Sequence, residues 1–416
     1  MAYLELKKLY YKNQDEYNAE YANRFDSENA VHLDFMVGNK PAFFVETTDV
    51  LRLALNIMKL DKEITKLSQS LPGIAKIQYS KKCLIDEIVL TNNIEGVHSS
   101  RKEIGEALDE LEQQSKAKHK HTRFLGLVNK YLKLMSTDTI PLQTCQDIRD
   151  LYDEVFLSEV MEENPENKPD GAIFRKGEES VYAGNGKAIH QGVYPEDKII
   201  HCMEQALSFL NSDQTQPLYQ ICLFHYMLEY IHPFYDGNGR LGRLILSYCI
   251  SKTLEPLLAY RISETIKENI NQYYKAFEVC NESLNLADLT PFLLMQLEMI
   301  HQSLLDLKQT LQEKKTRLDR YQSMFRSMGD AECELYSILT QAALFSEGGI
   351  SQKVLMQLLE IKSYSTFKNK ISTVPDDLLV SKTKGKGHAK YYELNLTYLD
   401  DILLQQGPEA QLEAHF

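Results

Sequence analysis

The sequence predicts a mainly α-helical protein with one small β-hairpin and a separate C-terminal domain of helices and strands. Apolar residues recur at helical spacing from Asp49 through Gln113 and again from Phe124 through Glu159. We read strands in short stretches near residues 171–187 and 378–394. The 416 residues are enough for two or three domains with ample core.

The first long helical stretch ends in a short polar motif. The helical run Cys83 to Leu90 is followed by Thr91-Asn-Asn-Ile-Glu95-Gly96. Glycine is common just after the last helical residue, so Gly96 is typical of a helix C-terminus. Further along the chain, the acidic and proline-containing segment Glu162 to Asp170 predicts a loop.

A short β-hairpin is predicted after that loop. Gly171-Ala-Ile-Phe-Arg175 and Ser180-Val-Tyr-Ala-Gly-Asn-Gly-Lys187 supply its residues, with Gly-Asn-Gly in the turn. Hairpins of this size are also ordinary surface features. By itself this segment therefore indicates no function.

A helix-loop-helix corner follows. The apolar run from Leu218 to Tyr230 predicts a buried helix that Pro233 ends, and a second amphipathic run begins near Arg240. Between them stands His232-Pro-Phe-Tyr-Asp-Gly-Asn-Gly-Arg-Leu-Gly-Arg243. Glycines permit positive backbone angles that turn N–H groups toward one point, and the dipole of the next helix favours an anion there. The corner therefore predicts a site for the phosphates of a nucleotide.

A long amphipathic helix is expected beyond this corner. Its apolar positions alternate spacings of three and four residues, as in a heptad repeat. These positions are Leu297, Ile300, Leu304, Leu307, Leu311, Leu318, Tyr321 and Phe325. We favour a helix packed on its own domain over pairing with a second chain in a homodimer, because Lys314 interrupts the seam.

The C-terminal part, residues 331–396, predicts a small separate domain of three helices and a hairpin. Leu335, Ile338 and Leu339 mark the first helix, Ser351 can cap the second, and Ser365 to Ile371 gives the third. Strands are expected at residues 378–380 and 391–394, joined by a lysine-glycine turn. This order resembles a winged helix.

Basic residues gather on the expected hairpin of this domain. They are Lys382, Lys384, Lys386 and Lys390, and the preceding helix offers Ser365, Thr366, Lys368 and Asn369. Such residues suit contacts with DNA phosphates. Winged helices also bind proteins, and lysines in a turn are often only solvated, so DNA binding is open but not favoured.

The twelve-residue corner resembles the signature of the Fic family. That pattern is His-Pro-Phe, any residue, Asp or Glu, Gly-Asn, Gly or Lys, Arg, two free positions and Arg, and His232 to Arg243 fills every fixed position. The resemblance implies a Fic-type helical core and nucleotidyl transfer. The group transferred is usually AMP, moved from ATP to a Ser, Thr or Tyr hydroxyl of a target protein, and self-modification is compatible with this activity.

The resemblance also implies a role for each residue of the motif. His232 is the general base, a task that suits imidazole because its ordinary pKa lies near neutrality. Asp236 is the ligand of Mg²⁺, which takes one carboxylate and fills its shell with phosphate oxygens and water. The expected phosphate-binding residues are Gly237, Asn238, Gly239, Arg240 and Arg243. Phe234 is expected to anchor the loop in the core.

The earlier motif resembles the inhibitory signature of Fic proteins, which is Ser or Thr, three free positions, Glu, and Gly or Asn. Thr91, Glu95 and Gly96 fill it. The family assigns this glutamate to the second arginine of the catalytic motif, here Arg243. Because Arg243 cannot hold a carboxylate and a γ-phosphate at once, Glu95 is expected to exclude or misplace ATP. No separate antitoxin would then be required.

Two further segments fit the family. The hairpin resembles the flap that lays an extended target segment beside the base, with Val181 and Tyr182 as candidate target-binding residues. The helix with Tyr273, Tyr274 and Asn281 resembles the one that closes over adenine, although a tyrosine pair is as often core. His225, in the apolar helix, is expected to be a core histidine rather than a second base.

These observations divide the chain into five regions. A helical N-terminal region with the inhibitory helix at about 83–96 occupies residues 1–120, and the catalytic core occupies 121–296. A connecting helix at 297–330, the winged-helix-like domain at 331–396 and a C-terminal tail at 397–416 complete the chain.

Composition points to a cytoplasmic enzyme. The formal net charge of −13 speaks against a surface that binds nucleic acid as a whole. No apolar run is long enough to cross a membrane, and residues 1–14 carry no signal segment. The seven cysteines include no Cys-x-x-Cys pair, which favours reduced thiols over disulfides or zinc.

Three alternatives stay open on the sequence. Some relatives transfer a phosphoryl group, but they carry lysine where this chain has Gly239, so AMP is favoured. Removal of AMP, with Glu95 placing a water molecule, uses the same site. A non-enzymatic regulator that senses nucleotide and binds DNA is disfavoured, because a sensor needs no base at His232.

Overall fold

The computed structural model describes residues 3–112, 124–133, 139–182, 188–326, 328–384 and 389–406. At residues 112, 181, 182, 188, 189, 331, 384 and 406 it describes the backbone alone. The chain forms two compact units, one of Met1–Lys62 and Leu84–Leu305, the other of Glu63–Cys83 and Asp306–Phe416.

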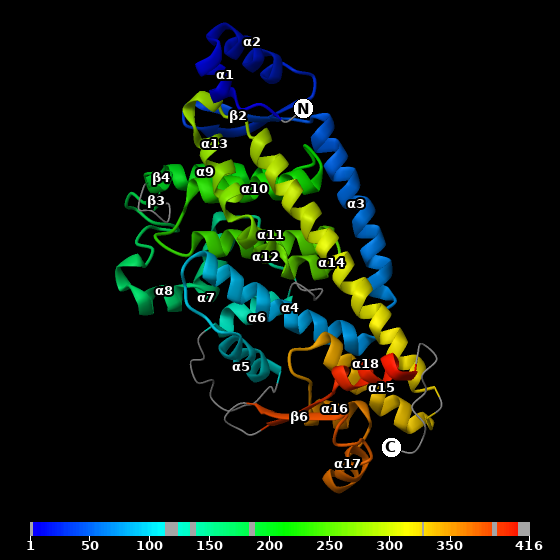
Figure 1. Ribbon diagram of the computed structural model, residues 1–416. Helices are drawn as coiled ribbons and strands as arrows, with labels where there is room; N and C mark the ends of the chain where they lie inside the picture. The colour runs from blue at the N-terminus through cyan, green and yellow to red at the C-terminus, as the bar shows by residue number, and fades with distance from the viewer. Residues whose placement is uncertain are drawn as a thin grey trace. The chain divides into compact units, whose positions relative to one another are not determined.

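The first unit contains most of the helices in Figure 1, and the mainly α-helical prediction is confirmed. Its elements before the hairpin are α1 (Leu6–Lys12), α2 (Gln14–Phe25), β1 (Ala30–Val37), β2 (Lys40–Val45), α3 (Thr48–Gln69), α4 (Gly73–Ile94), α5 (Arg101–Glu112), α6 (Leu125–Lys133), α7 (Cys145–Val155), α8 (Leu157–Glu163) and η1 (Pro165–Asn167). Those that follow are β3 (Ser180–Tyr182), β4 (Ala188–Gln191), α9 (Glu196–Leu210), α10 (Pro217–Ile231), α11 (Asn238–Thr253), η2 (Pro256–Tyr260), α12 (Ile262–Glu268), α13 (Ile270–Asn281), η3 (Ser283–Asn285) and α14 (Thr290–Met324). Helices α3, α4 and α14 have residues in both units.

The helical assignment of residues 1–120 is wrong at residues 30–45. Strands β1 and β2 pair there antiparallel, with Ala30 opposite Val45 and an irregular register between His32 and Met36. The buried side chains of β1 alternate with exposed ones, since Leu33, Phe35 and Val37 are buried. Alternation of this kind marks a strand with one face on the core, and the sequence analysis overlooked it.

The hairpin prediction holds for its second half only. Strands β3 and β4 pair antiparallel, with Ser180 opposite Gln191 and Val181 opposite His190. Residues 171–175 form no strand, because the carboxylate of Glu196 at the start of α9 accepts the backbone N–H groups of Ala172, Ile173 and Phe174. The predicted Gly-Asn-Gly turn lies outside the described residues.

The core of the first unit is the pair α10 and α11, which run side by side in Figure 1. Helix α10 is apolar around most of its circumference, and its residues from Leu218 to Leu228 are buried. A helix that is hydrophobic on all sides is stable only when neighbours cover it, and α9 and α11 both pack against α10. The predicted corner between α10 and α11 is confirmed.

The long helix α14 spans Thr290–Met324, so the bounds predicted for it, 297–330, are wrong at both ends. All eight residues of its predicted apolar stripe are buried in the folded chain. Because the stripe is covered within the chain, it is not free to pair with a second copy. The stripe therefore does not support a homodimer, which stays a prediction.

The second unit contains the predicted order of three helices and a hairpin. Its further elements are α15 (Asp330–Phe345), β5 (Ile350–Ser351), α16 (Gln352–Leu358), α17 (Tyr364–Ile371), β6 (Leu379–Lys384), β7 (Ala389–Leu394) and α18 (Leu396–Gln406). The strands form one sheet in the order β5-β7-β6, and the hydroxyl of Ser351 accepts the N–H of Val354 as the expected cap.

Two details of this unit differ from expectation. The tail predicted at 397–416 is wrong for residues 397–406, because α18 forms there and buries Leu399 and Leu403. The wing lysine Lys386 lies outside the described residues, and Lys382 pairs with Glu393 at 2.6 Å. The winged-helix assignment and DNA binding stay predictions. None of the described helices is long and apolar enough to cross a membrane.

Candidate active site

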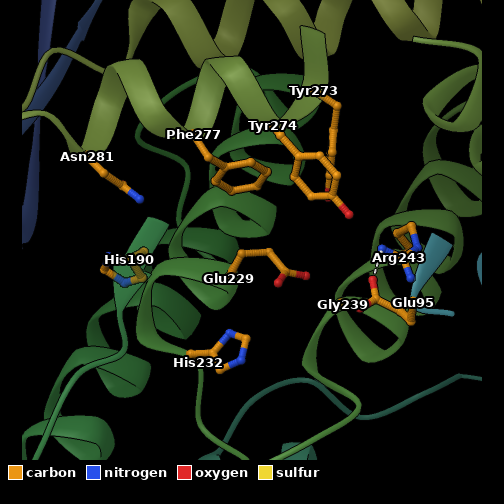
Figure 2. A pocket seen from close by; sticks show the side chains of 10 residues that line it. All are labelled: Glu95, His190, Glu229, His232, Gly239, Arg243, Tyr273, Tyr274, Phe277 and Asn281. Carbon is orange, nitrogen blue, oxygen red and sulfur yellow. Dashed lines mark ion pairs between the residues drawn. The ribbon is translucent and has the colours of Figure 1, made fainter. Parts of the chain in front are cut away.

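The loop that carries His232 begins where α10 ends. The backbone N–H of His232 donates to the carbonyl of Leu228 at 2.9 Å, and its φ of 53° lies in the left-handed region. Because Pro233 follows, the helix cannot continue. The turn leaves the imidazole of His232 in the wall of a pocket, as Figure 2 shows.

Arg175 fixes the loop of His232 by donating hydrogen bonds to backbone carbonyls. Its fully buried guanidinium donates from Nε to the carbonyl of His232 at 2.8 Å and from Nη2 to that of Val193 at 2.9 Å, and Nη1 donates to Gly177. A side chain on Gly192 would enter this space, since its Cβ would lie 2.5 Å from Nη2. Sequence analysis placed Arg175 in a strand and missed this role, which no sequence signal indicates.

The side-chain amide of Asn238 also holds this loop, through the backbone of Phe234. Its Nδ2 donates to the carbonyl of Phe234 at 2.8 Å and its Oδ1 accepts the N–H of Phe234 at 2.9 Å. The buried ring of Phe234 stacks on Tyr152 with centroids 3.7 Å apart, so it anchors the loop as expected. The side chain of Asn238 is thus engaged in the loop, which leaves its backbone N–H for an anion.

The start of α11 is built to bind an anion. Gly237 precedes it with φ of 80°, whereas Asn238 and Gly239 are already helical, so of these three residues only Gly237 has the positive φ expected. The first N–H groups of a helix lack acceptors within the helix, and the dipole adds positive charge at this end. Amides of the first turn of α11 therefore face the direction from which a phosphate would come.

The pocket in Figure 2 brings together seven of the predicted site residues. It is lined by Glu95, His190, Glu229, His232, Gly239, Arg243, Tyr273, Tyr274, Phe277 and Asn281. The predicted residues Asp236, Gly237, Asn238 and Arg240 are not in its lining. Sequence analysis missed His190, Glu229 and Phe277.

Arg243 is held from three sides by the end of α4. Its Nη1 lies 2.8 Å from Oε1 of Glu95, its Nε donates to the hydroxyl of Thr91 at 2.8 Å, and its Nη2 donates to the carbonyl of Thr91 at 3.1 Å. Burial alone would lower the pKa of Arg243, but Glu95 and its other neighbours raise it. The guanidinium therefore stays charged with its donors committed to α4. Gly96, with φ of 74°, follows α4 as the C-cap glycine predicted.

Helix α4 is fixed to the core one turn before Thr91. The fully buried carboxyl of Glu87 accepts the N–H of Ser263 at 2.9 Å and its hydroxyl at 2.6 Å. Thr91 and Asn92 are also fully buried, whereas a third of the Glu95 side chain is exposed. The helix is thus immobilised in the protein core, and Glu95 reaches the pocket from its end.

Gly239 provides the space that Glu95 occupies. A Cβ atom at position 239 would lie 2.3 Å from Oε1 of Glu95 and 3.1 Å from Nη1 of Arg243. Contacts this short do not occur in folded proteins, so any side chain at 239 would displace the carboxylate.

His232 is held as a neutral imidazole. Burial in the pocket wall, with Arg175 and His190 nearby, lowers the pKa of His232 to about 3. The imidazole is therefore neutral at physiological pH. A neutral imidazole has one nitrogen with a free lone pair, which is the form that a general base requires.

Arg240 lies behind the pocket rather than in its lining. Its Nη1 pairs with Oε1 of Glu159 at 3.0 Å, and its guanidinium lies 5.3 Å from the ring centre of Phe156. Two buried donors, Nε and Nη2, have no hydrogen-bond partner among the described residues. Buried unpaired donors on a cation are a natural contact for an anion.

Glu229 is a carboxyl group inside the pocket that the sequence analysis missed. It stands three residues before His232 on α10, and its Oε1 has no hydrogen-bond partner among the described residues. Oε1 fits against Gly242, whose Cβ would lie 2.2 Å from it. Burial, with Glu95 nearby, raises the pKa of Glu229 to about 8 although Arg243 opposes the shift.

The two tyrosines of α13 differ in their surroundings. Tyr273 is buried and its hydroxyl lies 2.7 Å from Nε2 of His225, whose pKa burial lowers to about 3. His225 is therefore a buried core residue, as predicted. Tyr274 keeps 37% of its surface exposed and presents its ring to the pocket. Of the pair, Tyr274 has the face available for stacking.

The opposite end of the pocket from Arg243 is polar as well. The hydroxyl of Tyr226 donates to Oδ1 of Asn281 at 2.7 Å. His190, on β4, has Nε2 at 2.6 Å from the carbonyl of Tyr230 and its ring 4.5 Å from that of Tyr230. Both side chains are labelled on the same side of Figure 2. The candidate target-binding residues Val181 and Tyr182 lie on β3, where only the backbone is described.

The surroundings of Asp236 fit a magnesium ion. Mg²⁺ usually keeps several waters and binds one or two carboxylates together with substrate phosphates. Asp236 supplies one half-buried carboxylate directly before the amides of α11, and its Oδ1 accepts the N–H of Gly237 at 2.5 Å. A metal held here would lie beside a phosphate bound at the start of α11.

Comparison with known proteins agrees with this geometry. Residues 143–250 match the model of the Fic/DOC family, and this segment includes α10 and most of α11. These residues form a Fic domain. The segment also contains His232, Asp236 and Arg243, whereas Glu95 on the end of α4 and Asn281 on α13 lie outside it.

Relatives of the Fic domain extend the similarity along the chain. The chain is 28% identical over 260 residues to a protein adenylyltransferase Fic of Drosophila grimshawi, covering 61% of this chain and 48% of that protein. It is 28% identical over 241 residues to the protein of the same name from Aedes aegypti, covering 56% and 44%. The chain thus spans about half the length of the curated relatives it matches.

A solved structure supports the fold. A Fic family protein from Desulfovibrio desulfuricans G20 superposes with a TM-score of 0.51 at 22% identity, covering 85% of this chain and 97% of that one. At this identity the similarity concerns the fold alone. It covers much more of this chain than the Fic domain does.

Proposed function

We propose that this protein transfers AMP from ATP to a hydroxyl side chain of a target protein, and that Glu95 restrains the reaction. The observation that carries the proposal is the pocket itself. The neutral imidazole of His232 and the buried guanidinium of Arg243 line one cavity, and the anion-binding start of α11 borders it. The names of the relatives support the same class of reaction.

The chemistry follows from the residues. His232 takes the proton of the attacking hydroxyl as the oxygen forms a bond to the α-phosphorus, and the bond from that phosphorus to the bridging oxygen breaks, so pyrophosphate leaves. The amides at the start of α11 and the unpaired donors of Arg240 would stabilise the negative charge that accumulates on the phosphates. Mg²⁺ at Asp236 would neutralise phosphate charge when bound.

Restraint by Glu95 follows from the contacts that Arg243 already makes. All three of its donor nitrogens already contact Glu95 or Thr91. A γ-phosphate would need the position of the Glu95 carboxylate, since both seek the same guanidinium. Productive ATP binding therefore requires Glu95 to leave Arg243.

Gly239 supports AMP rather than phosphoryl transfer. Its missing side chain leaves space next to Arg243, and Glu95 fills that space at present. Once Glu95 leaves, the same space admits a β-phosphate, which orients the α-phosphate toward His232. The flap formed by β3 and β4 would hold an extended target segment by strand addition.

Labelling with α-labelled ATP and Mg²⁺ tests the proposal. We expect strong label on protein for Glu95→Gly, little for wild type, and none for Glu95→Gly combined with His232→Ala. Asn93→Gly is the matched control, because it places glycine at an exposed position only two residues before Glu95. Equal labelling by wild type and Glu95→Gly would refute the restraint, and label that survives His232→Ala would refute the base. Label from γ-labelled ATP would instead indicate phosphoryl transfer.

Removal of AMP from a modified target is a second candidate. It is favoured by one observation, namely that Glu95 and His232 line the same pocket. A carboxylate there is suited to orient a water molecule toward the phosphorus. Incubation of a target preloaded with labelled AMP distinguishes the two, because wild type should then release label and Glu95→Gly should not.

A further inference from the structure

Two carboxyl groups, rather than one, lie against the helix that carries Arg243. Gly239 and Gly242 are three residues apart on α11 and therefore share one face of that helix. A Cβ atom at position 239 would lie 2.3 Å from Oε1 of Glu95, and one at position 242 would lie 2.2 Å from Oε1 of Glu229. Figure 2 shows the Glu229 carboxyl directed across the cavity toward Arg243 and Glu95. Both acids thus lie beside the arginine to which the proposed function assigns phosphate.

The two carboxyl groups differ in their partners. Glu95 is paired with Arg243 at 2.8 Å and is one third exposed. Oε1 of Glu229 is buried and has no hydrogen-bond partner among the described residues. A carboxylate that is buried without a partner is costly when ionised. Burial, with Glu95 nearby, accordingly raises the pKa of Glu229 to about 8, although Arg243 opposes the shift.

The other titratable groups around Glu229 keep one charge state through the neutral range. Burial lowers the pKa of the histidines on α10 and β4, which are therefore neutral, namely His190, His225 and His232. Burial raises the pKa of Tyr273 and Tyr274 on α13, which are neutral as well. Arg243 on α11 stays charged. When Glu95 on α4 is replaced, Glu229 is the group left to titrate among the described residues of the pocket lining.

We propose that Glu229 makes nucleotide binding depend on its own proton, because the neutral acid tolerates phosphates beside Arg243 and the carboxylate repels them. Like charges at close range disfavour the ionised form of both groups, and an unpaired like charge in a site excludes its ligand. Gly242, which gives Glu229 its place, occupies a free position of the Fic signature, so this arrangement is not required by the motif. The inference rests on the proposed nucleotide site and adds pH as a regulator of it.

The dependence of ATP affinity on pH tests this role. Glu95→Gly and the double variant with Glu229→Gln are titrated calorimetrically with ATP and constant excess Mg²⁺, from about pH 6 to about pH 9. The Kd of Glu95→Gly should rise about tenfold per pH unit once Glu229 ionises, because the competent fraction falls by that factor. The rise should begin below pH 8, because Glu95→Gly removes a charge that raises the pKa of Glu229.

The double variant keeps the shape of Glu229 without its charge. Its Kd should therefore stay nearly constant across the range, and any change that arises from ATP itself will occur in both proteins. Glu95→Gly combined with Glu204→Gln is the control, because Glu204 is exposed on α9 and outside the pocket lining. This control should follow the profile of Glu95→Gly.

Proton uptake gives a second readout that does not depend on affinity. Titrations at about pH 9 in buffers of different ionisation enthalpy should show uptake of about one proton per ATP for Glu95→Gly and none for the double variant. Parallel pH profiles for these two proteins would overturn the role of Glu229 and leave the nucleotide site intact. Weaker binding by the double variant at every pH would also overturn it, because Glu229 would then attract the nucleotide. A folded Glu95→Gly that binds ATP at no pH would overturn the proposed function, and this inference with it.

Discussion

The ion pair between Glu95 and Arg243 sets a measurable limit on the affinity for ATP. If Glu95 must leave before the γ-phosphate can bind, the apparent Kd is the intrinsic Kd divided by the fraction of molecules in which the pocket is open. Hydrogen bonds between charged groups contribute about 1.5–3 kcal/mol. Arg243 is 1% exposed but Glu95 is 33% exposed, so solvent screens the pair in part and we take about 1.5–2.5 kcal/mol.

This energy corresponds to a roughly 10- to 70-fold rise in apparent Kd, since 1.4 kcal/mol is a factor of ten. Glu95→Gly should therefore bind ATP that much more tightly than wild type in calorimetric titration. Glu95→Gln keeps an acceptor but loses the charge. It should retain the ~1 kcal/mol of a neutral hydrogen bond, so we expect a smaller gain of about 2- to 12-fold. Asn93→Gly should leave the Kd unchanged. The same Kd for wild type, Glu95→Gln and Glu95→Gly would refute the competition for Arg243.

Three further outcomes follow from the contacts around the pocket. Thr91→Val removes the hydroxyl that accepts Nε of the buried Arg243 at 2.8 Å. The midpoint of urea unfolding should therefore fall by the equivalent of about 1–3 kcal/mol, and an unchanged midpoint would contradict that hydrogen bond. Lysine at position 175 cannot reproduce the three carbonyl contacts of Arg175. Arg175→Lys in the Glu95→Gly background should therefore lower kcat by about 10- to 100-fold with little change in KM. A change confined to KM would argue against positioning of His232 by Arg175. The pKa of Glu229 is about 8 in the folded protein and 4.5 ordinarily. Between these two pH values the folded protein keeps a proton that the unfolded chain releases. The free energy of unfolding of wild type therefore falls as the pH rises from 4.5 to 8. Glu229→Gln should therefore gain about 1–3 kcal/mol over wild type at pH 8 and little at pH 4.5, and a gain that does not depend on pH would show that Glu229 is ionised when folded.

The sequence predicted those parts of the site that depend on local order along the chain. The residues from His232 to Arg243 form one corner, so their types and spacing define the loop, the helix start and the base without knowledge of the rest. The C-cap at Gly96 and the N-cap at Ser351 were equally local. Burial of the α14 stripe followed from periodicity, although α14 begins at Thr290.

What the sequence left out depends on contacts between distant segments. Arg175 is 57 residues from the carbonyl that it holds at His232, and nothing in its neighbourhood indicates that contact. The missing strand at 171–175 depends on the carboxylate of Glu196, the first residue of α9. The strand β1 is a different case, because the alternation of Leu33, Phe35 and Val37 was readable and was overlooked.

The anchoring of α4 determines how fast the restraint can change. Glu87, Thr91 and Asn92 are locked in the core, and only the residue after the helix end must move. Opening the pocket is then a change of side-chain rotamer, which takes picoseconds to nanoseconds in exposed residues, rather than the unfolding of a helix, which takes far longer. The closed and open states would therefore exchange many times within one catalytic turnover. A ligand that holds Glu95 outward would thus act by shifting a rapid equilibrium, and its effect on activity would appear and disappear as quickly as the ligand itself binds and leaves.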